Sequence, residues 1–228
     1  MKIADNVFML QVGTYHLVLT WDAENLVLID AGFPGQIDEL TEAMKEAGFA
    51  VANLTHLIIT HQDWDHVGCV TDLQRLVPKL RVIAHGEEAP YIDGRKIPLK
   101  LAARLAVYDT LAEDMRAMCD QWQEVYQNQQ ITITDQVHDG IELPLCGGIQ
   151  VIHTPGHTPG HIVLHLRESG IMVCGDAANV QDGELVSFYP EYDQDIEQAK
   201  ESLAKLKAYE MKGAVAYHSG FLKVENFL

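Results

Sequence analysis

The sequence has few basic residues, few cysteines and no long apolar run. Sixteen Lys and Arg residues oppose 33 Asp and Glu residues, which leaves a formal net charge of -17 at pH 7. This excess of negative charge opposes binding to a phosphate backbone, so nucleic acid is not expected as a partner. No stretch approaches the roughly 20 apolar residues of a spanning helix, so the sequence excludes a membrane span and a membrane partner.

The four cysteines are scattered along the chain and form no CxxC pair. At a length of 228 residues this number of cysteines does not indicate a disulfide framework. Residues 1–20 contain a single Lys and alternate apolar with polar side chains, unlike a secretory signal. We therefore expect a cytoplasmic protein in which the thiols are small core residues.

The hydrophobic content of 47% is that of an ordinary globular protein, and we expect a single domain over residues 1–228. Apolar patterning and turn residues predict three strands before Asp30, helices over 36–47, 66–78 and 193–208, further strands over 57–60, 81–84 and 132–174, and a final strand over 214–217. Strands and helices recur in both halves of the chain. This order predicts an α/β fold with two sheets face to face and helices outside.

Residues 99–126 carry apolar side chains at steps of three and four, which predicts one long helix with one apolar face. The apolar positions are Leu101, Leu105, Tyr108, Leu111, Met115, Met118, Trp122 and Val125. The simplest interpretation of this face is ordinary core.

Four potential metal ligands lie within the six-residue run His61, Gln62, Asp63, Trp64, Asp65, His66. Imidazoles and carboxylates bind divalent metals, and a catalytic site needs several of them to converge. Alternate residues of an extended loop point the same way, so His61 and Asp63 can bind one ion while Asp65 and His66 face a second. Taken alone, the run is also compatible with a solvated polar loop.

Three later features match this loop. Residues 154–160 place prolines and glycines around His157, which fixes a rigid turn. The apolar run 171–174 leads to Asp176, and the strand over 214–217 leads to His218. Each residue lies where a core strand meets a loop, the usual place for functional groups on a rigid scaffold.

With the Asp-x-Gly turn at Asp30, these motifs make the chain resemble the metallo-β-lactamase superfamily of metal-dependent hydrolases. The family signature is a His-x-His-x-Asp-His loop followed by a His, an Asp and a His, each at the end of a strand. The resemblance implies a four-layer αβ/βα sandwich with a helical insertion near residues 97–127. In relatives such insertions often cover the site or form a dimer interface, so a lid with an apolar substrate contact and a homodimer are further interpretations.

The resemblance also implies a site with two divalent metal ions, most simply zinc. It assigns His61, Asp63 and His157 to the first ion, Asp65, His66 and His218 to the second, and Asp176 to a bridge between them. Asp30 is implied to be structural. Among the other histidines, His161 lies beside the same turn as His157 and is a candidate for holding a ligand in orientation. We expect His56 and His85, which flank buried strands, to be structural, and we assign no function to His16, His138, His153 and His165.

Asp63 departs from the family signature, which usually has histidine at this position. The substitution keeps a ligand but adds a negative charge. The positive charge of two divalent ions is then formally balanced by the negative charges of three carboxylates and a bridging hydroxide. We hypothesise that such a core favours uncharged substrates over dianionic phosphates. The carboxylate also makes the first site harder, so manganese and iron are alternatives to zinc.

The predicted activity is hydrolysis of a small ester, lactone or thioester by a metal-bridging hydroxide, with Asp65 as the catalytic residue that orients it and moves the proton. The alternatives are an iron-dependent redox enzyme acting on oxygen or a persulfide, a phosphodiesterase, and a non-catalytic ligand-binding protein stabilised by metal. Lactonase relatives carry a tyrosine soon after the bridging Asp, whereas this chain has Tyr189 and Tyr192 further on. Glyoxalase II relatives carry a long C-terminal extension, whereas ten residues follow His218 here.

Overall fold

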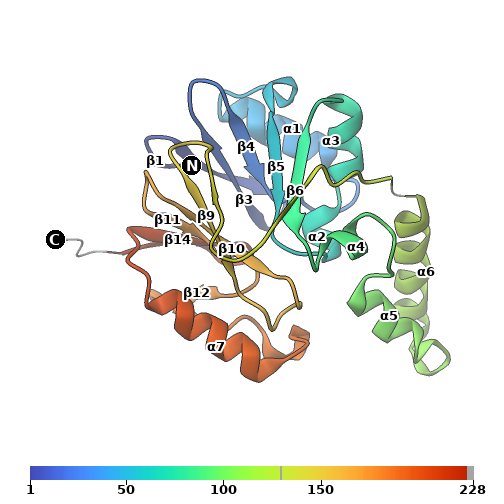
Figure 1. The fold of residues 1–228 in the computed structure, drawn as a ribbon. Coiled ribbons are helices and arrows are strands. Elements are labelled where there is room, and N and C mark those ends of the chain that lie inside the picture. Colours follow the sequence, from blue (N-terminus) through green and yellow to red (C-terminus); the bar gives the residue numbers. More distant parts are fainter. Residues whose placement is uncertain (129, 225–228) are drawn as a thin grey trace.

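Two β-sheets packed face to face form the centre of the structure, a computed structural model that describes residues 1–128 and 130–224 (Figure 1). The seven strands of the first sheet follow chain order: β1 Lys2–Ala4, β2 Val7–Val12, β3 Tyr15–Trp21, β4 Leu26–Ile29, β5 His56–Ile59, β6 Arg81–His85 and β7 Asp135–Val137. The second sheet has the order β15 Gly220–Lys223, β14 Gly213–Ala216, β11 Ile171–Val173, β10 Ile162–Leu166, β9 Ile149–His153 and β8 Glu142–Leu143. A separate hairpin pairs β12 Asn179–Gln181 with β13 Glu184–Val186.

Helices cover the outer faces of both sheets, which gives the predicted four layers (Figure 1). Helices α1 (Ile37–Glu46) and α3 (Val70–Leu76) lie outside the first sheet, and α7 (Ile196–Lys207) lies outside the second. Two short helices, α2 (Trp64–Val67) and α4 (Ala89–Ile92), follow β5 and β6. The predicted α/β sandwich is therefore confirmed.

Strand β4 shows how the sequence builds these layers. Its four residues are all apolar and buried. Leu26 and Leu28 join the core cluster that contains α1 and α3, while Val27 and Ile29 join the cluster between the two sheets. Because successive side chains of a strand point to opposite faces, a continuous apolar run fits a sheet that is covered on both sides.

The direction of the strands decides where functional groups meet. Strands β4 to β7 run parallel, and in the second sheet β14 pairs parallel with β11. Strand β9 is antiparallel to β10, which is antiparallel to β11, so β9, β11 and β14 share one direction. The residues that follow β5, β9, β11 and β14 therefore gather at one edge of the sandwich, as in other open α/β sheets.

The predicted single helix over residues 99–126 is wrong. The structure has two helices, α5 (Leu99–Leu105) and α6 (Glu113–Asn128), joined by a 3-10 turn at Tyr108–Thr110. Val107 and Leu111, which flank this turn, lie outside helical backbone geometry. Leu105 of α5 and Trp122 of α6 pack into the same apolar cluster, so the spacing reflects a shared burial face and not an unbroken helix.

Two predictions about strand number are also wrong. The segment before Asp30 contains four strands, because β1 is a separate three-residue strand paired with β2. The strand over 214–217 is not the last, because β15 follows and pairs with β14. All four cysteines are buried and unpaired, as core thiols should be. Within residues 1–128 and 130–224, no helix has the length and apolar character needed to cross a membrane.

Asp22 links the turn after β3 to the turn before β9, and so joins the two sheets. Its Oδ2 accepts the Cys146 N–H at 2.8 Å, and its Oδ1 accepts the N–H groups of Glu24 and Asn25. Hydrogen bonds from the Asn25 side chain and the Glu24 backbone lower the pKa of Asp22 to about 2. The ionised Asp22 therefore stabilises the folded state above its unfolded pKa of roughly 4, and this contribution is lost as the pH falls toward its folded pKa.

We expect the unfolding free energy of the wild type to fall more steeply between about pH 4 and pH 2 than that of Asp22→Asn. The asparagine keeps a hydrogen-bond acceptor but cannot ionise. Urea denaturation at a series of acidic pH values measures the difference. Parallel curves for the two proteins would show that Asp22 does not link proton binding to folding.

Candidate metal centre

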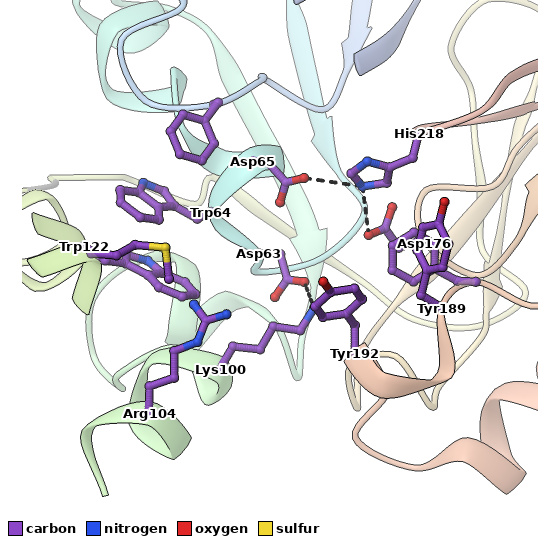
Figure 2. A pocket seen from close by; sticks show the side chains of 13 residues that line it. Asp63, Trp64, Asp65, Lys100, Arg104, Trp122, Asp176, Tyr189, Tyr192 and His218 are labelled. Carbon is purple, nitrogen blue, oxygen red and sulfur yellow. Dashed lines mark hydrogen bonds and ion pairs between the residues drawn. The ribbon is translucent and has the colours of Figure 1, made fainter. Parts of the chain in front are cut away.

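The seven residues predicted to bind metal come together where the strands end. His61, Asp63, Asp65 and His66 follow β5 and enter α2, and His157 lies in the loop between β9 and β10. Asp176 follows β11, and His218 follows β14. Figure 2 shows Asp63, Asp65, Asp176 and His218 around one pocket. Parallel strand direction thus converts four distant sequence motifs into one cluster.

The cluster divides into two groups of ligand atoms. In the first group, His61, Asp63, His157 and Asp176 each offer an atom within 4.8 Å of the others, and in the second group Asp65, His66 and His218 do the same. Asp176 reaches both groups. Its Oδ2 lies 3.5 Å from His157 Nε2 and 3.3 Å from His218 Nε2, and its Oδ1 lies 3.3 Å from His66 Nε2. The two groups have the same members as the sequence-based assignment, and Asp176 lies between them; that these residues bind metal stays a prediction.

Three buried atoms of the cluster lack a hydrogen-bond partner among the described residues. They are His61 Nε2, His66 Nε2 and Asp176 Oδ1. A buried polar atom without a partner lowers the stability of the fold by roughly 1–3 kcal/mol. Three such atoms close together therefore destabilise the fold unless another group binds them. Imidazole nitrogens and carboxylate oxygens are the ligands of zinc, manganese and iron. The donor set therefore fits a divalent metal ion.

Neighbouring side chains orient the histidines of both groups. His66 Nδ1 lies 3.0 Å from Asp30 Oδ2, and His157 Nδ1 lies 3.0 Å from Asp193 Oδ1. A proton on Nδ1 that is donated to a carboxylate leaves Nε2 free to bind a metal. Asp30, which was predicted to be structural, makes this contact from a left-handed backbone conformation with φ of 61°. Asp193 was not identified from the sequence.

Comparison with known proteins defines the family. The sequence profile described as "Metallo-beta-lactamase superfamily" matches residues 12–212, a segment that contains six of the seven clustered residues, all but His218. This chain belongs to the metallo-β-lactamase superfamily.

Members of the superfamily with similar sequences include bacterial and fungal proteins. The chain is 27% identical to the "Probable metallo-hydrolase YflN" of Bacillus subtilis, covering 94% of this chain and 83% of the relative. It is 24% identical to the "Atrochrysone carboxyl ACP thioesterase dmxR1" of a Cryptosporiopsis species, over 74% of this chain but 39% of that protein. The chain is thus a probable metal-dependent hydrolase of this superfamily by sequence.

Solved structures of superfamily members share the fold. A metallo-beta-lactamase family protein from Thermus thermophilus superposes with a TM-score of 0.77 and 21% identity, covering 97% of this chain and 76% of that chain. A metallo-beta-lactamase of Cronobacter sakazakii described by a HARLDQ motif has a TM-score of 0.68 and 21% identity, over 95% of this chain and 79% of that chain. Both results support the observed fold.

Glu88 is a buried member of the site that the sequence analysis missed. Its Oε2 accepts the backbone and side-chain N–H groups of Gln62 at 2.8 and 3.0 Å, and its Oε1 accepts the Gly160 N–H at 2.7 Å. Burial raises the pKa of Glu88, while these donors and Thr158 act in the opposite direction. The carboxylate thus ties the His61–His66 loop to the turn that carries His157.

His161 supports Asp176 from behind. Its Nε2 accepts the Asp176 N–H at 3.1 Å, and its Nδ1 lies 2.8 Å from Thr154 Oγ1. Burial, together with His61, holds the pKa of His161 well below its usual value, so the ring is neutral and can accept this hydrogen bond. Gly175 permits the close approach, because a Cβ at its left-handed position would lie 2.9 Å from His161 Nε2. The candidate orienting residue therefore contacts a residue of the cluster.

Lys100 of helix α5 enters the first group, and no sequence signal distinguished it from other lysines. Its Nζ forms an ion pair with Asp63 Oδ2 (Figure 2). The same Nζ lies 3.0 Å from His157 Nε2. Burial alone would raise the pKa of Asp63, but His61 and Lys100 outweigh it and hold the pKa well below the usual range. The carboxylate that replaces the family's usual histidine therefore has a cation of its own.

The cluster opens into a pocket of about 360 Å³. Most of its wall is apolar or aromatic, formed by Phe33, Trp64, Met118, Trp122, Phe188, Tyr189 and Tyr192. Trp122 of α6 stacks on Trp64, with ring centroids 4.9 Å apart, and the guanidinium of Arg104 lies over Trp122 (Figure 2). The helical insertion therefore forms one wall of the pocket, and its buried apolar face also serves as core. The pocket has the size and lining of a small-molecule site.

Proposed function

We propose that the chain hydrolyses a small carboxylic ester, lactone or thioester with an apolar acyl or alcohol part. One observation carries this proposal. Two clusters of His and Asp side chains, with Asp176 between them, lie at one end of an aromatic pocket. The name of the fungal thioesterase among its relatives is consistent with acyl chemistry. A dianionic phosphate is disfavoured as substrate, because three carboxylates line the pocket: Asp63, Asp65 and Asp176.

The residues of the cluster would hold the metal and position the reactants. Asp65, His66, His218 and Asp176 would hold one ion, and His61, Asp63 and His157 are the family's positions for a second. When bound, such an ion acidifies a water molecule and polarises the carbonyl group of the substrate. Zinc is the first expectation, with manganese and iron as alternatives because of the added Asp63 carboxylate.

Asp65 is the residue we assign to proton movement. Its side chain is about one-fifth exposed to the pocket, whereas that of Asp176 is almost fully buried. The Tyr217 hydroxyl donates to the backbone carbonyl of Asp65 at 2.6 Å, which fixes the loop at this point. The Asp65 carboxylate would therefore take a proton from the attacking water and return it to the leaving group.

A panel of substrates tests the proposed reaction. The native protein should cleave p-nitrophenyl esters, lactones or thioesters faster than phosphodiesters. Turnover of a phosphodiester far above every acyl substrate would overturn the proposal. A visible iron spectrum that changes with oxygen, together with no hydrolysis of any substrate, would favour the redox alternative.

Substitution of Trp122 by alanine is expected to raise KM for aryl and long-chain esters roughly 10-fold, because one aromatic contact contributes about 1.5 kcal/mol. The KM for an acetyl ester should change little, since a short acyl group does not reach this wall. Val125→Ala is the matched control, because Val125 packs in the same cluster but does not line the pocket. Equal KM changes for short and long esters would argue that the Trp122 face serves as core alone.

A further inference from the structure

Helix α5 holds Lys100 at a defined place in the metal centre. The Leu99 N–H donates to Gln62 Oε1 at 2.8 Å, and Gln62 lies between His61 and Asp63. The start of α5 is therefore hydrogen-bonded to the ligand loop itself. The Lys100 side chain is 17% exposed, and its Nζ lies 5.5 Å from the centre of the Tyr192 ring, so the ammonium group is enclosed on several sides.

The atoms that Lys100 contacts are the atoms a metal ion would need. An ammonium group has three donors and no lone pair, so His157 Nε2 can only accept from it. The same nitrogen also lies 3.0 Å from Asp63 Oδ2, while His157 Nδ1 faces Asp193 Oδ1 at 3.0 Å. Asp63 Oδ2, the other partner of Lys100, is also the oxygen nearest His61, at 3.2 Å from His61 Nε2. Lys100 and a first metal ion would thus compete for the same two ligands.

The second group has no comparable cation. Among residues 1–128 and 130–224, the ion pairs of Asp65 involve His66 and His218 alone, and no Lys or Arg pairs with Asp176. The His66 Nε2 and Asp176 Oδ1 atoms also remain without a hydrogen-bond partner in this part of the chain. Within the described residues the two groups therefore differ: a lysine ammonium group enters the first, and no Lys or Arg pairs with the carboxylates of the second.

We infer that Lys100 supplies the cation of the first group, so that the protein binds one metal ion tightly, at Asp65, His66, His218 and Asp176. The inference rests on the metal dependence of the proposed function, since both concern the same centre. A divalent ion bonded to Asp63 and His157 would lie against the ammonium group, and this repulsion weakens binding at the first group on the order of 10²–10³-fold. Asp63, which stands where the family usually has histidine, and Lys100 then act together. Their ion pair takes the place of a second metal ion.

Metal titration of the full chain tests this inference without any substrate. A chelator first removes metal from three proteins: wild type, Lys100→Met and Lys100→Gln. Each is then titrated with Zn²⁺ against a chromophoric competitor to measure the Kd values. After dialysis, mass spectrometry measures the zinc content per chain. We expect one tightly bound ion per chain in the wild type and two in both variants, with the second Kd lowered on the order of 10²-fold or more. Arg104→Met is the matched control, because Arg104 lies one turn further along α5 and should leave the wild-type stoichiometry unchanged.

Other results would overturn the inference. If the wild type binds two ions with similar affinity, the metal displaces Lys100 from Asp63 and His157. If both Lys100 variants bind one ion, Lys100 is not what prevents metal binding at the first group. Either result leaves the proposed hydrolysis standing, because one ion is still bound. A wild-type protein that binds no zinc, manganese or iron would instead overturn the proposed function and this inference together.

Discussion

The Asp65→Ala variant is expected to lose roughly 10²–10⁴-fold in kcat for the best ester or lactone substrate, the range typical of a positioned acid or base. Asp65 is the carboxylate of the centre with the most exposed side chain, and its Oδ2 lies 3.4 Å from His218 Nε2 and 3.9 Å from His66 Nε2. Its removal would take away both the group assigned to proton transfer and one of the carboxylates proposed to hold the metal. Steady-state kinetics on the purified variant measure the loss.

The matched control is Asp72→Ala, which removes a half-buried carboxylate of α3 whose ion pair, within the described part of the chain, is with Arg75. This variant should keep the wild-type kcat. The metal content of Asp65→Ala separates the two roles of Asp65, since a variant that retains its ion but not its activity has lost proton transfer alone. An unchanged kcat in a variant with native metal content would exclude the assigned role of Asp65.

The Glu88→Ala variant is expected to lose about 3–5 kcal/mol of unfolding free energy, because its removal breaks a buried hydrogen-bond network whose orphaned donors each cost about 1–3 kcal/mol. The N–H groups of Gln62 and Gly160 that now donate to Glu88 would be left buried without an acceptor. For a domain of this size the melting temperature should fall by roughly 10 °C. Thermal unfolding followed by circular dichroism measures the change.

Two further variants make the Glu88 prediction specific. Glu87→Ala alters the neighbouring, exposed carboxylate and should have little effect on stability. Glu88→Gln keeps the shape but directs an amide N–H at existing donors, so it should also destabilise the fold. Metal affinity should fall with stability in both Glu88 variants, because the linked loops carry His61 and His157. A Glu88→Ala protein as stable as wild type would show that the two loops are held together by other contacts.

The residues of the cluster could be selected from the sequence because each one follows an apolar strand or lies in a short, distinctive motif, and their role as metal ligands stays a prediction. His61, Asp176 and His218 all have this signature, and parallel strand order then requires them to meet. The fold class followed from the same strand and helix order. The strand-and-helix order was therefore enough for the fold class, although the helix over 99–126 and two strand counts were wrong.

Features that depend on tertiary approach did not follow from the sequence. Glu88 and Glu87 are adjacent carboxylates with no local difference, yet only Glu88 is enclosed by two distant loops. Lys100 lies at the start of α5, in an insertion whose apolar spacing predicted one long helix, and its approach to Asp63 accompanies a tertiary hydrogen bond from Leu99 to Gln62. Strand β15 (Gly220–Lys223) was missed because it is short and most of its residues are only partly buried or exposed.

The most direct test of the metal-dependent hydrolase is kcat/KM for the best substrate of the acyl panel, measured as purified, after removal of metal, and after metal is added back. We predict that the chelated protein remains folded but loses hydrolysis, and that one equivalent of zinc, manganese or iron restores it. Hydrolysis that persists at the original rate in protein shown to be free of metal would contradict the central claim.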